Sequence, residues 1–176
     1  MITPIYRLVL AAAFDALPPR VRELHDLQAP AVWLGRADVK RGASLTARVL
    51  ATLFGLPPNG PDQPLSVTFT PMPDHEIWQR NFAGRIFLSR QYAASDRIRE
   101  AVGPVSLIMR PVVTSNGMSL NMVGARPWRL PLPSLLVPRI TTREYEGDGR
   151  YCFEVSATLP LIGPLVEYRG WLAKRD

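Results

Sequence analysis

EIWQRNFAGRIFLSRQY, residues 76–92, contains two strand-like runs that meet at Ala83-Gly84. Aromatic and β-branched residues favour strands, and a short link with glycine suits a tight antiparallel turn. Side chains in a strand alternate between two faces. One face of the first run therefore holds two large aromatic side chains together with an acid and a base: Glu76, Trp78, Arg80 and Phe82.

Six further runs after residue 64 share this strand-like character. With the two runs in residues 76–92, they are LSVTFT, EIWQRNFA, RIFLSRQY, VSLIMRPVV, MSLNMVGA, ITTREYE, RYCFEVSA and LVEYRGWLA. Turn signals separate them, most clearly Ser115-Asn116-Gly117 and Gly147-Asp148-Gly149. Because no long helical segment lies between the runs, parallel crossovers are excluded and an antiparallel meander is expected. About eight strands, several apolar on both faces, predict a strongly curved sheet or barrel, calycin-like or helix-grip-like.

The first 60 residues are predicted to be mainly helical. Helices are expected over 4–17 and again after Pro18-Pro19, and residues 31–42 are a candidate strand. Ser44 suits an N-cap for a third helix, which carries an apolar stripe of Leu45, Val49, Leu50, Leu53 and Phe54. We therefore predict an α+β fold in one domain, residues 1–176. Its helical cap region would span 1–60 and its antiparallel sheet 64–174, with the helices covering one face or plugging an opening.

Composition excludes several classes of protein. The net charge is +6, but the arginines are scattered singly, and no basic nucleic-acid-binding module is present, so no nucleic-acid partner is predicted. A single cysteine excludes an internal disulfide and a cysteine-based zinc site. The apolar run Leu8–Phe14 is too short to cross a membrane and lacks the pattern of a signal peptide, so a cytoplasmic location is expected.

Two interpretations of the 76–82 face remain open. The aromatics either pack into a solid core beside an ion pair, or the face lines a cavity in which Arg80 orients the polar head of a ligand. In both cases Arg80 needs an acidic or carbonyl partner, because an unpaired buried charge is too costly. Glu100 is within plausible reach, since Gly103-Pro104 predicts a bulge or bend nearby. The candidate ligand-binding residues are Glu76, Trp78, Arg80, Phe82, Glu100, Met109, Met122 and Trp171.

Catalysis is not indicated by any motif. Glu76 and Glu100 form a conceivable acid/base pair, but no nucleophile or metal ligand accompanies them, and no catalytic residue, metal site or cofactor is predicted. His25 is interpreted as a helix-end or packing residue. Residues 127–138 form an apolar, proline-rich connection that either covers the core, acts as an entrance lid, or contacts a partner or membrane surface, with Arg129 and Arg139 flanking it.

An ordered set of short motifs spans nearly the whole chain. They are Leu17-Pro18, Leu24-His25, Leu56-Pro57-Pro58, Glu76-x-Trp78-x-Arg80-x-Phe82, Glu100-x-x-Gly103-Pro104, Leu130-Pro131-Leu132-Pro133, Leu159-Pro160-Leu161-Ile162-Gly163-Pro164 and Tyr168-Arg169-Gly170-Trp171-Leu172. This set resembles a bacterial family, domain-of-unknown-function family 4166 (DUF4166). The resemblance implies a domain that occurs alone or beside a dehydrogenase-like domain, and it implies no established activity.

Two functions follow as hypotheses. The first is a domain that binds a small apolar or lipid-like ligand in a cavity between the curved sheet and the helices. The alternative is a non-catalytic accessory module that docks on a dehydrogenase-like partner through residues 127–138. This chain has no Gly-x-Gly-x-x-Gly fingerprint, so no nicotinamide site of its own is expected.

Overall fold

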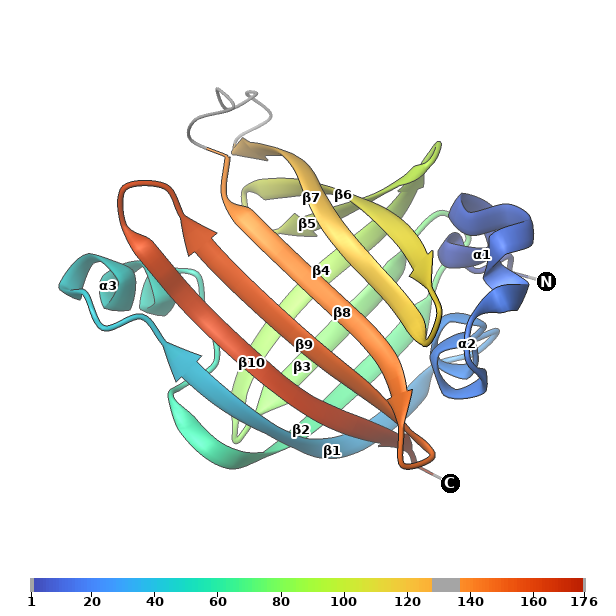
Figure 1. Ribbon diagram of the computed structural model, residues 1–176, viewed down its shortest axis with the longest axis horizontal. Coiled ribbons are helices and arrows are strands. Elements are labelled where there is room, and N and C mark those ends of the chain that lie inside the picture. The colour runs from blue at the N-terminus through green and yellow to red at the C-terminus, as the bar shows by residue number, and fades with distance from the viewer. Residues whose placement is uncertain (1, 128–136, 176) are drawn as a thin grey trace.

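A computed structural model describes residues 2–127 and 137–175. Within these residues, ten strands form one closed antiparallel barrel in the order β1-β10-β9-β8-β7-β6-β5-β4-β3-β2 (Figure 1). The strands are β1 (Ala31–Arg41), β2 (Gly60–Pro71), β3 (Glu76–Phe82), β4 (Arg85–Ala94), β5 (Arg97–Val102), β6 (Val105–Thr114), β7 (Gly117–Pro127), β8 (Arg139–Gly147), β9 (Arg150–Leu159) and β10 (Gly163–Lys174). The predicted antiparallel, strongly curved architecture is confirmed.

The barrel contains more of the chain than the sequence predicted. About eight strands were expected and ten are present. Residues 31–41 form β1, which pairs with both β2 and β10 and so closes the barrel. The sheet thus extends beyond residues 64–174, and the first 60 residues are not all helical. Gly103-Pro104 is also not a bend inside one strand, since it forms the turn between β5 and β6. Closure leaves no free edge strand in the barrel.

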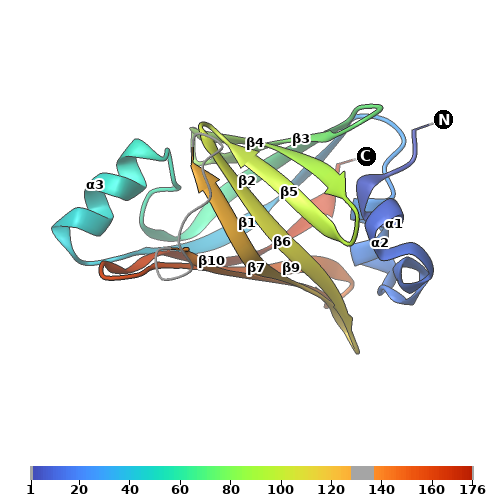
Figure 2. The ribbon, with the colours of Figure 1, turned by 90° about the horizontal axis from the view of Figure 1, so that it is seen from above.

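Helices lie at both ends of the barrel. At one end, which we call the plugged end, are α1 (Ile5–Leu10), the 3-10 helix η1 (Ala11–Ala16) and α2 (Pro19–His25), as Figures 1 and 2 show. At the opposite end, the α3 end, lies α3 (Leu45–Leu53). The Ser44 hydroxyl accepts a hydrogen bond from the Ala47 amide at 3.1 Å, the N-cap that the sequence predicted. No helix in the described ranges is both long and apolar enough to span a lipid bilayer.

The hairpin at residues 83–84 has a two-residue loop in which both residues adopt positive φ. Ala83 has φ 48° and Gly84 has φ 95°. This conformation matches the twist of the two flanking strands, β3 and β4. The β8–β9 loop, at the plugged end, uses the same conformation with Asp148 at φ 50° and Gly149 at φ 68°. Local turn chemistry therefore fixes the register of both hairpins.

The hydrophobic core is concentrated toward the plugged end. Tyr6, Phe14 and Val21 are fully buried there, beside Trp33 and Trp78 on the barrel wall. Full burial of such a side chain contributes about 1.5–3 kcal/mol. The N-terminal helices are therefore an integral part of the folded core, and the prediction that they plug an opening is confirmed.

Candidate functional site

The face of β3 that faces the barrel interior is the one selected from the sequence. Glu76, Trp78 and Phe82 are buried, whereas Gln79 on the opposite face is exposed. Trp78, Arg80 and Phe82 line an internal cavity of about 410 Å³. This volume falls in the range of about 300–1,000 Å³ that is typical of small-molecule sites. This face therefore borders a cavity and also contributes to an ion pair, and its role in ligand binding remains a prediction.

The cavity changes character along the barrel axis. Toward the plugged end, its wall includes Tyr6, Gln91, Glu144 and Tyr151. Toward the α3 end, the lining is apolar, and it includes Leu50, Phe54, Val102, Val105, Pro127 and Leu165. The arrangement provides a polar floor near the plugged end and an apolar passage leading to the α3 end.

Arg80 lies between these two regions and has the acidic partner that the sequence required. Its guanidinium donates to the Ser89 hydroxyl at 2.8 Å and pairs with Glu100 at 3.4 Å. The Trp78 ring lies beneath the guanidinium, with 4.8 Å from Cζ to the ring centroid. Both members of the ion pair are largely buried, with side chains 13% and 11% exposed. These contacts fix the position of the positive charge at the cavity wall.

Glu76 is held separately from Arg80. Its carboxylate accepts hydrogen bonds from the Ile5 backbone amide at 3.3 Å and from the Trp78 indole at 3.2 Å. Burial raises the pKa of Glu76 above its ordinary value, and the charge interaction with His25 and the hydrogen bonds from Trp78 and Ile5 offset only part of that effect. The carboxylate thus ties α1 to β3, which is a structural role at the base of the cavity.

A second polar group at the floor was not identified from the sequence. His25, the last residue of α2, places its Nε2 atom 2.5 Å from Glu144 Oε2. The Tyr6 hydroxyl donates to Gln91 Oε1 at 2.9 Å. The Tyr6 and His25 rings are in contact, with centroids 3.8 Å apart. Tyr6 of α1 and His25 of α2 thus form one buried polar cluster with two strand residues, Gln91 of β4 and Glu144 of β8.

The floor tyrosines are held in their neutral form. Burial raises the pKa of Tyr6 and of Tyr151 well above the ordinary tyrosine value, and the negative charge of Glu144 acts in the same direction. Their hydroxyl groups are therefore available as neutral hydrogen-bonding groups rather than as phenolates.

The remaining predicted site residues are divided between the inside and the outside of the barrel. Met109 is buried and lines the cavity. Met122 is half-buried and does not line it, although it pairs directly with Met109 across β6 and β7. Trp171 is on the outer surface, where its ring lies 4.2 Å from the Arg150 guanidinium carbon. Its neighbour Leu172 faces the interior instead. Of the candidate residues, Glu76, Met122 and Trp171 thus do not line this cavity, and ligand binding by the candidates remains a prediction.

Residues 128–136 lie outside the described part of the chain, so the predicted roles of the 127–138 connection are not tested. Its two described flanks, Pro127 and Pro138, line the cavity near the α3 end. Docking of a dehydrogenase-like partner through this segment remains a prediction. In residues 2–127 and 137–175, no group of three or more His, Cys, Asp or Glu side chains is arranged to hold a metal ion.

The floor residues escaped the sequence analysis for an identifiable reason. Glu144 lies between Arg143 and Tyr145 in a strand that has polar residues on both faces. The alternation of the sequence therefore does not indicate which face of this strand points into the barrel. Tyr6 and His25 belong to short helices whose docking on the barrel depends on tertiary contacts. The available signal was the alternation Ile140, Thr142, Glu144, which puts an acid in line with an apolar residue.

Comparison with known proteins agrees with the resemblance found in the sequence. The family model described as Domain of unknown function (DUF4166) matches residues 17–172. The chain belongs to this family. The match covers all ten strands of the DUF4166 barrel except the last residues of β10, together with α2 and α3. No curated protein and no solved structure matches the chain.

Proposed function

We propose that this DUF4166 protein binds one small, mainly apolar molecule inside its barrel. The observation that carries the proposal is the cavity of about 410 Å³, which lies within the barrel, is partly open to solvent and is lined mainly by apolar side chains. Burial of apolar ligand surface in such a space is favourable by about 25 cal/mol per Å². An elongated ligand fits the direction of the cavity, with its apolar body toward the α3 end and its polar end at the floor.

The charges at the floor constrain the polar end of this ligand. Among the described residues with buried side chains, three carboxylates lie near Tyr6, those of Glu144, Glu100 and Glu76. The interior cation Arg80 is already paired with one of them. A ligand carboxylate would add a negative charge to this region. We therefore infer an uncharged head with hydroxyl, carbonyl or amide groups, which Tyr6, Gln91 and Arg80 can hydrogen-bond.

A fluorescence titration tests the proposal. N-phenyl-1-naphthylamine, an uncharged apolar dye, is expected to bind the wild-type protein with increased emission. Ala125 lines the cavity, so Ala125→Phe fills part of it and is expected to weaken dye binding about tenfold or more, which corresponds to about 1.4 kcal/mol. Ala157→Leu, a smaller change in the same wall, should have an intermediate effect. Circular dichroism would confirm that each variant is folded.

The matched control introduces a phenylalanine on the outer surface of the barrel. Ala173 is exposed on β10, so Ala173→Phe should leave dye binding unchanged. Dodecanol should displace the dye at lower concentration than dodecanoate if the head is uncharged. Failure of the wild-type protein to bind the dye, or equal binding by Ala125→Phe, would refute the cavity as a binding site. Stronger displacement by dodecanoate would refute only the inference about the head.

A further inference from the structure

Helix α3 presents three different faces. Ala47 and Ala51 are fully buried against Leu165 of β10. Leu50 and Phe54 face the cavity. The third face, formed by three residues at four-residue spacing, is directed to solvent: Leu45 is 76% exposed, Val49 51% and Leu53 75%. Three of the five residues of the apolar stripe seen in the sequence are therefore unpacked, and the contact with the barrel is made by Ala47, Leu50 and Ala51.

The β9–β10 turn beside α3 is apolar as well. Leu159 and Ile162 pack against the same α3 cluster, which places the turn next to the helix. Leu161, at the tip, is 97% exposed and has φ 66°. Glycine or asparagine adopts this backbone conformation more easily than leucine does. Leu161 is thus both almost fully exposed and in a backbone conformation that leucine seldom adopts.

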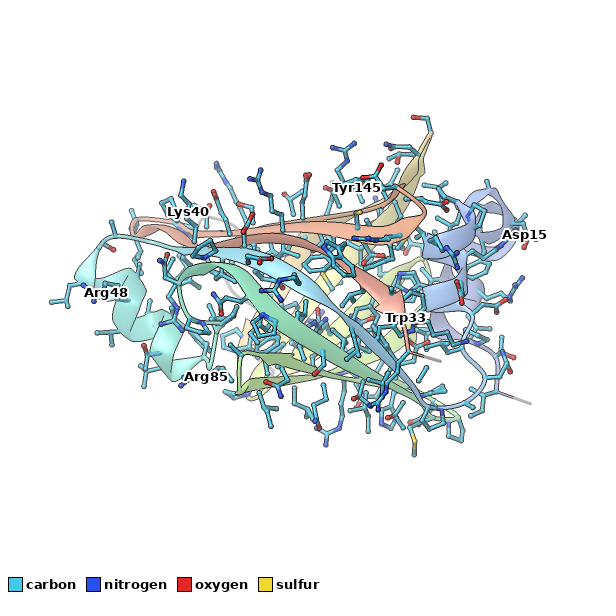
Figure 3. All side chains as sticks on the ribbon, turned by 90° about the horizontal axis from the view of Figure 1, so that it is seen from below. Asp15, Trp33, Lys40, Arg48, Arg85 and Tyr145 are labelled. Atoms are coloured by element: carbon cyan, nitrogen blue, oxygen red, sulfur yellow. The ribbon has the colours of Figure 1, made fainter. Side chains whose placement is uncertain are left out.

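Arginines surround this apolar end of the molecule. Among the described residues, five arginines at this end form no salt bridge, Arg41, Arg48, Arg85, Arg126 and Arg139, and Arg22, Arg90, Arg99 and Arg150 elsewhere form none either. The Arg85 guanidinium donates to the Thr52 carbonyl of α3 at 3.1 Å. Figure 3 shows Arg48 and Arg85 at the α3 end, whereas Asp15 lies at the opposite end. Burial, and secondarily the positive charge of Arg85, lowers the pKa of Arg41, as expected for neighbouring cations.

We propose that the α3 end is a docking surface for an anionic phospholipid membrane, with Leu45, Leu53 and Leu161 inserted between lipids. Exposed leucines next to cationic side chains are the combination that binds membrane interfaces, since apolar insertion and attraction to anionic headgroups act together. The unpaired arginines provide the charge complementarity. Leu45 and Leu53 lie on α3, and Leu161 lies at the tip of the β9–β10 turn. This inference goes beyond ligand binding, because it concerns the outer surface and needs no ligand in the cavity.

Vesicle flotation of the full-length protein tests this surface. The wild-type protein is expected to float with vesicles of phosphatidylcholine mixed with phosphatidylglycerol, and much less with phosphatidylcholine alone. The double variant Leu53→Ser/Leu161→Ser should bind at least about tenfold more weakly, because two leucines no longer insert. Arg48→Gln/Arg126→Gln should weaken binding by a smaller factor and reduce its dependence on salt.

Matched controls carry the same substitutions elsewhere. Leu8 and Leu34 are exposed leucines away from α3, so Leu8→Ser/Leu34→Ser should leave flotation unchanged. Arg90→Gln/Arg175→Gln is the corresponding control for charge. The variant Ala125→Phe should float like the wild type, so failure of ligand binding and failure of membrane binding are separable.

Three results would overturn the proposal. They are no flotation of the wild type with anionic vesicles, equal flotation of the α3-end leucine variant, and equal loss in the Leu8/Leu34 control. A fourth concerns a competing occupant, a second copy of the chain. If sedimentation velocity shows a wild-type dimer that Leu53→Ser dissociates, while no vesicles are bound, the surface is a protein interface instead.

Discussion

The two ends of the barrel differ in how tightly their helices pack against it. At the plugged end, α1, η1 and α2 contribute fully buried aromatic side chains and a hydrogen-bonded polar cluster, and both chain termini lie nearby (Figure 1). At the α3 end, a single helix packs through Ala47, Leu50 and Ala51 and leaves Leu45 and Leu53 exposed to solvent. One end is closed by tight packing, whereas the other is covered by a helix with few anchoring contacts.

This difference indicates where stability and access reside. Burial of large side chains ties the N-terminal helices to global folding, so the plugged end is expected to open only on unfolding. The α3 contact buries little apolar surface, so its local stability is expected to be low, and α3 borders the apolar passage into the cavity. Ligand entry is therefore expected at the α3 end.

The largest expected effect comes from two phenylalanines at the two ends. Phe14 is 0% exposed in the plug, whereas Phe54 is 39% exposed beside α3. Phe14→Ala should lower the free energy of unfolding by about 3–5 kcal/mol, because it leaves a cavity in a tightly packed site. Phe54→Ala should cost about 1 kcal/mol or less, since its ring is only partly buried. Urea unfolding measures both, and equal losses would contradict the contrast between the ends.

A smaller effect concerns the dependence of stability on pH. The pKa of Glu76 is raised above its ordinary value of 4.5 by burial, so the folded state binds its proton more tightly than the unfolded state does. Stability from this group is therefore fully present below pH 4.5 and is lost as pH rises through the folded-state pKa, with a slope of at most about 1.4 kcal/mol per pH unit. Glu76→Gln should remove this loss.

The measurement is the difference in Tm between wild type and Glu76→Gln across this pH range. The Tm of the wild type should fall relative to the Tm of Glu76→Gln as pH increases. Glu167 is exposed on β10, so Glu167→Gln serves as the control and should show a flat difference. A wild-type advantage that grows with pH would show that the charge interaction with His25 and the hydrogen bonds from Trp78 and Ile5 together outweigh burial.

The smallest effect compares the hairpin loops at the two ends. The β3–β4 loop, at the α3 end, and the β8–β9 loop, at the plugged end, have the same backbone conformation. The first loop has Ala83-Gly84 in this conformation, and the second has Asp148-Gly149. Alanine is unfavourable at positive φ, whereas asparagine and aspartate tolerate it. Ala83→Asn should stabilise the protein by about 0.5–1 kcal/mol, and Asp148→Ala should destabilise it by a similar amount. Calorimetry that finds no gain at 83 would show that tertiary contacts, not turn chemistry, set this loop.

Sequence reasoning succeeded where a local pattern was sufficient. The alternation at Glu76, Trp78, Arg80 and Phe82 predicted a common face, and burial requirements predicted an acidic partner for Arg80. It failed for Trp171, because its strand has aromatic or apolar residues on both faces. The face that points inward is set by pairing with β1 and β9, which the strand itself does not encode.

The sequence by itself determined an antiparallel set of short strands preceded by helices, the turn at residues 83–84, and one polar-aromatic face of β3. Only the tertiary structure decided that β1 closes the barrel, that Tyr6, His25 and Glu144 meet at its floor, and that Leu45 and Leu53 of α3 remain in solvent. The physical reason is range: alternation and turn preference act over a few residues, whereas closure and helix docking depend on burial between segments more than 100 residues apart, as for His25 and Glu144.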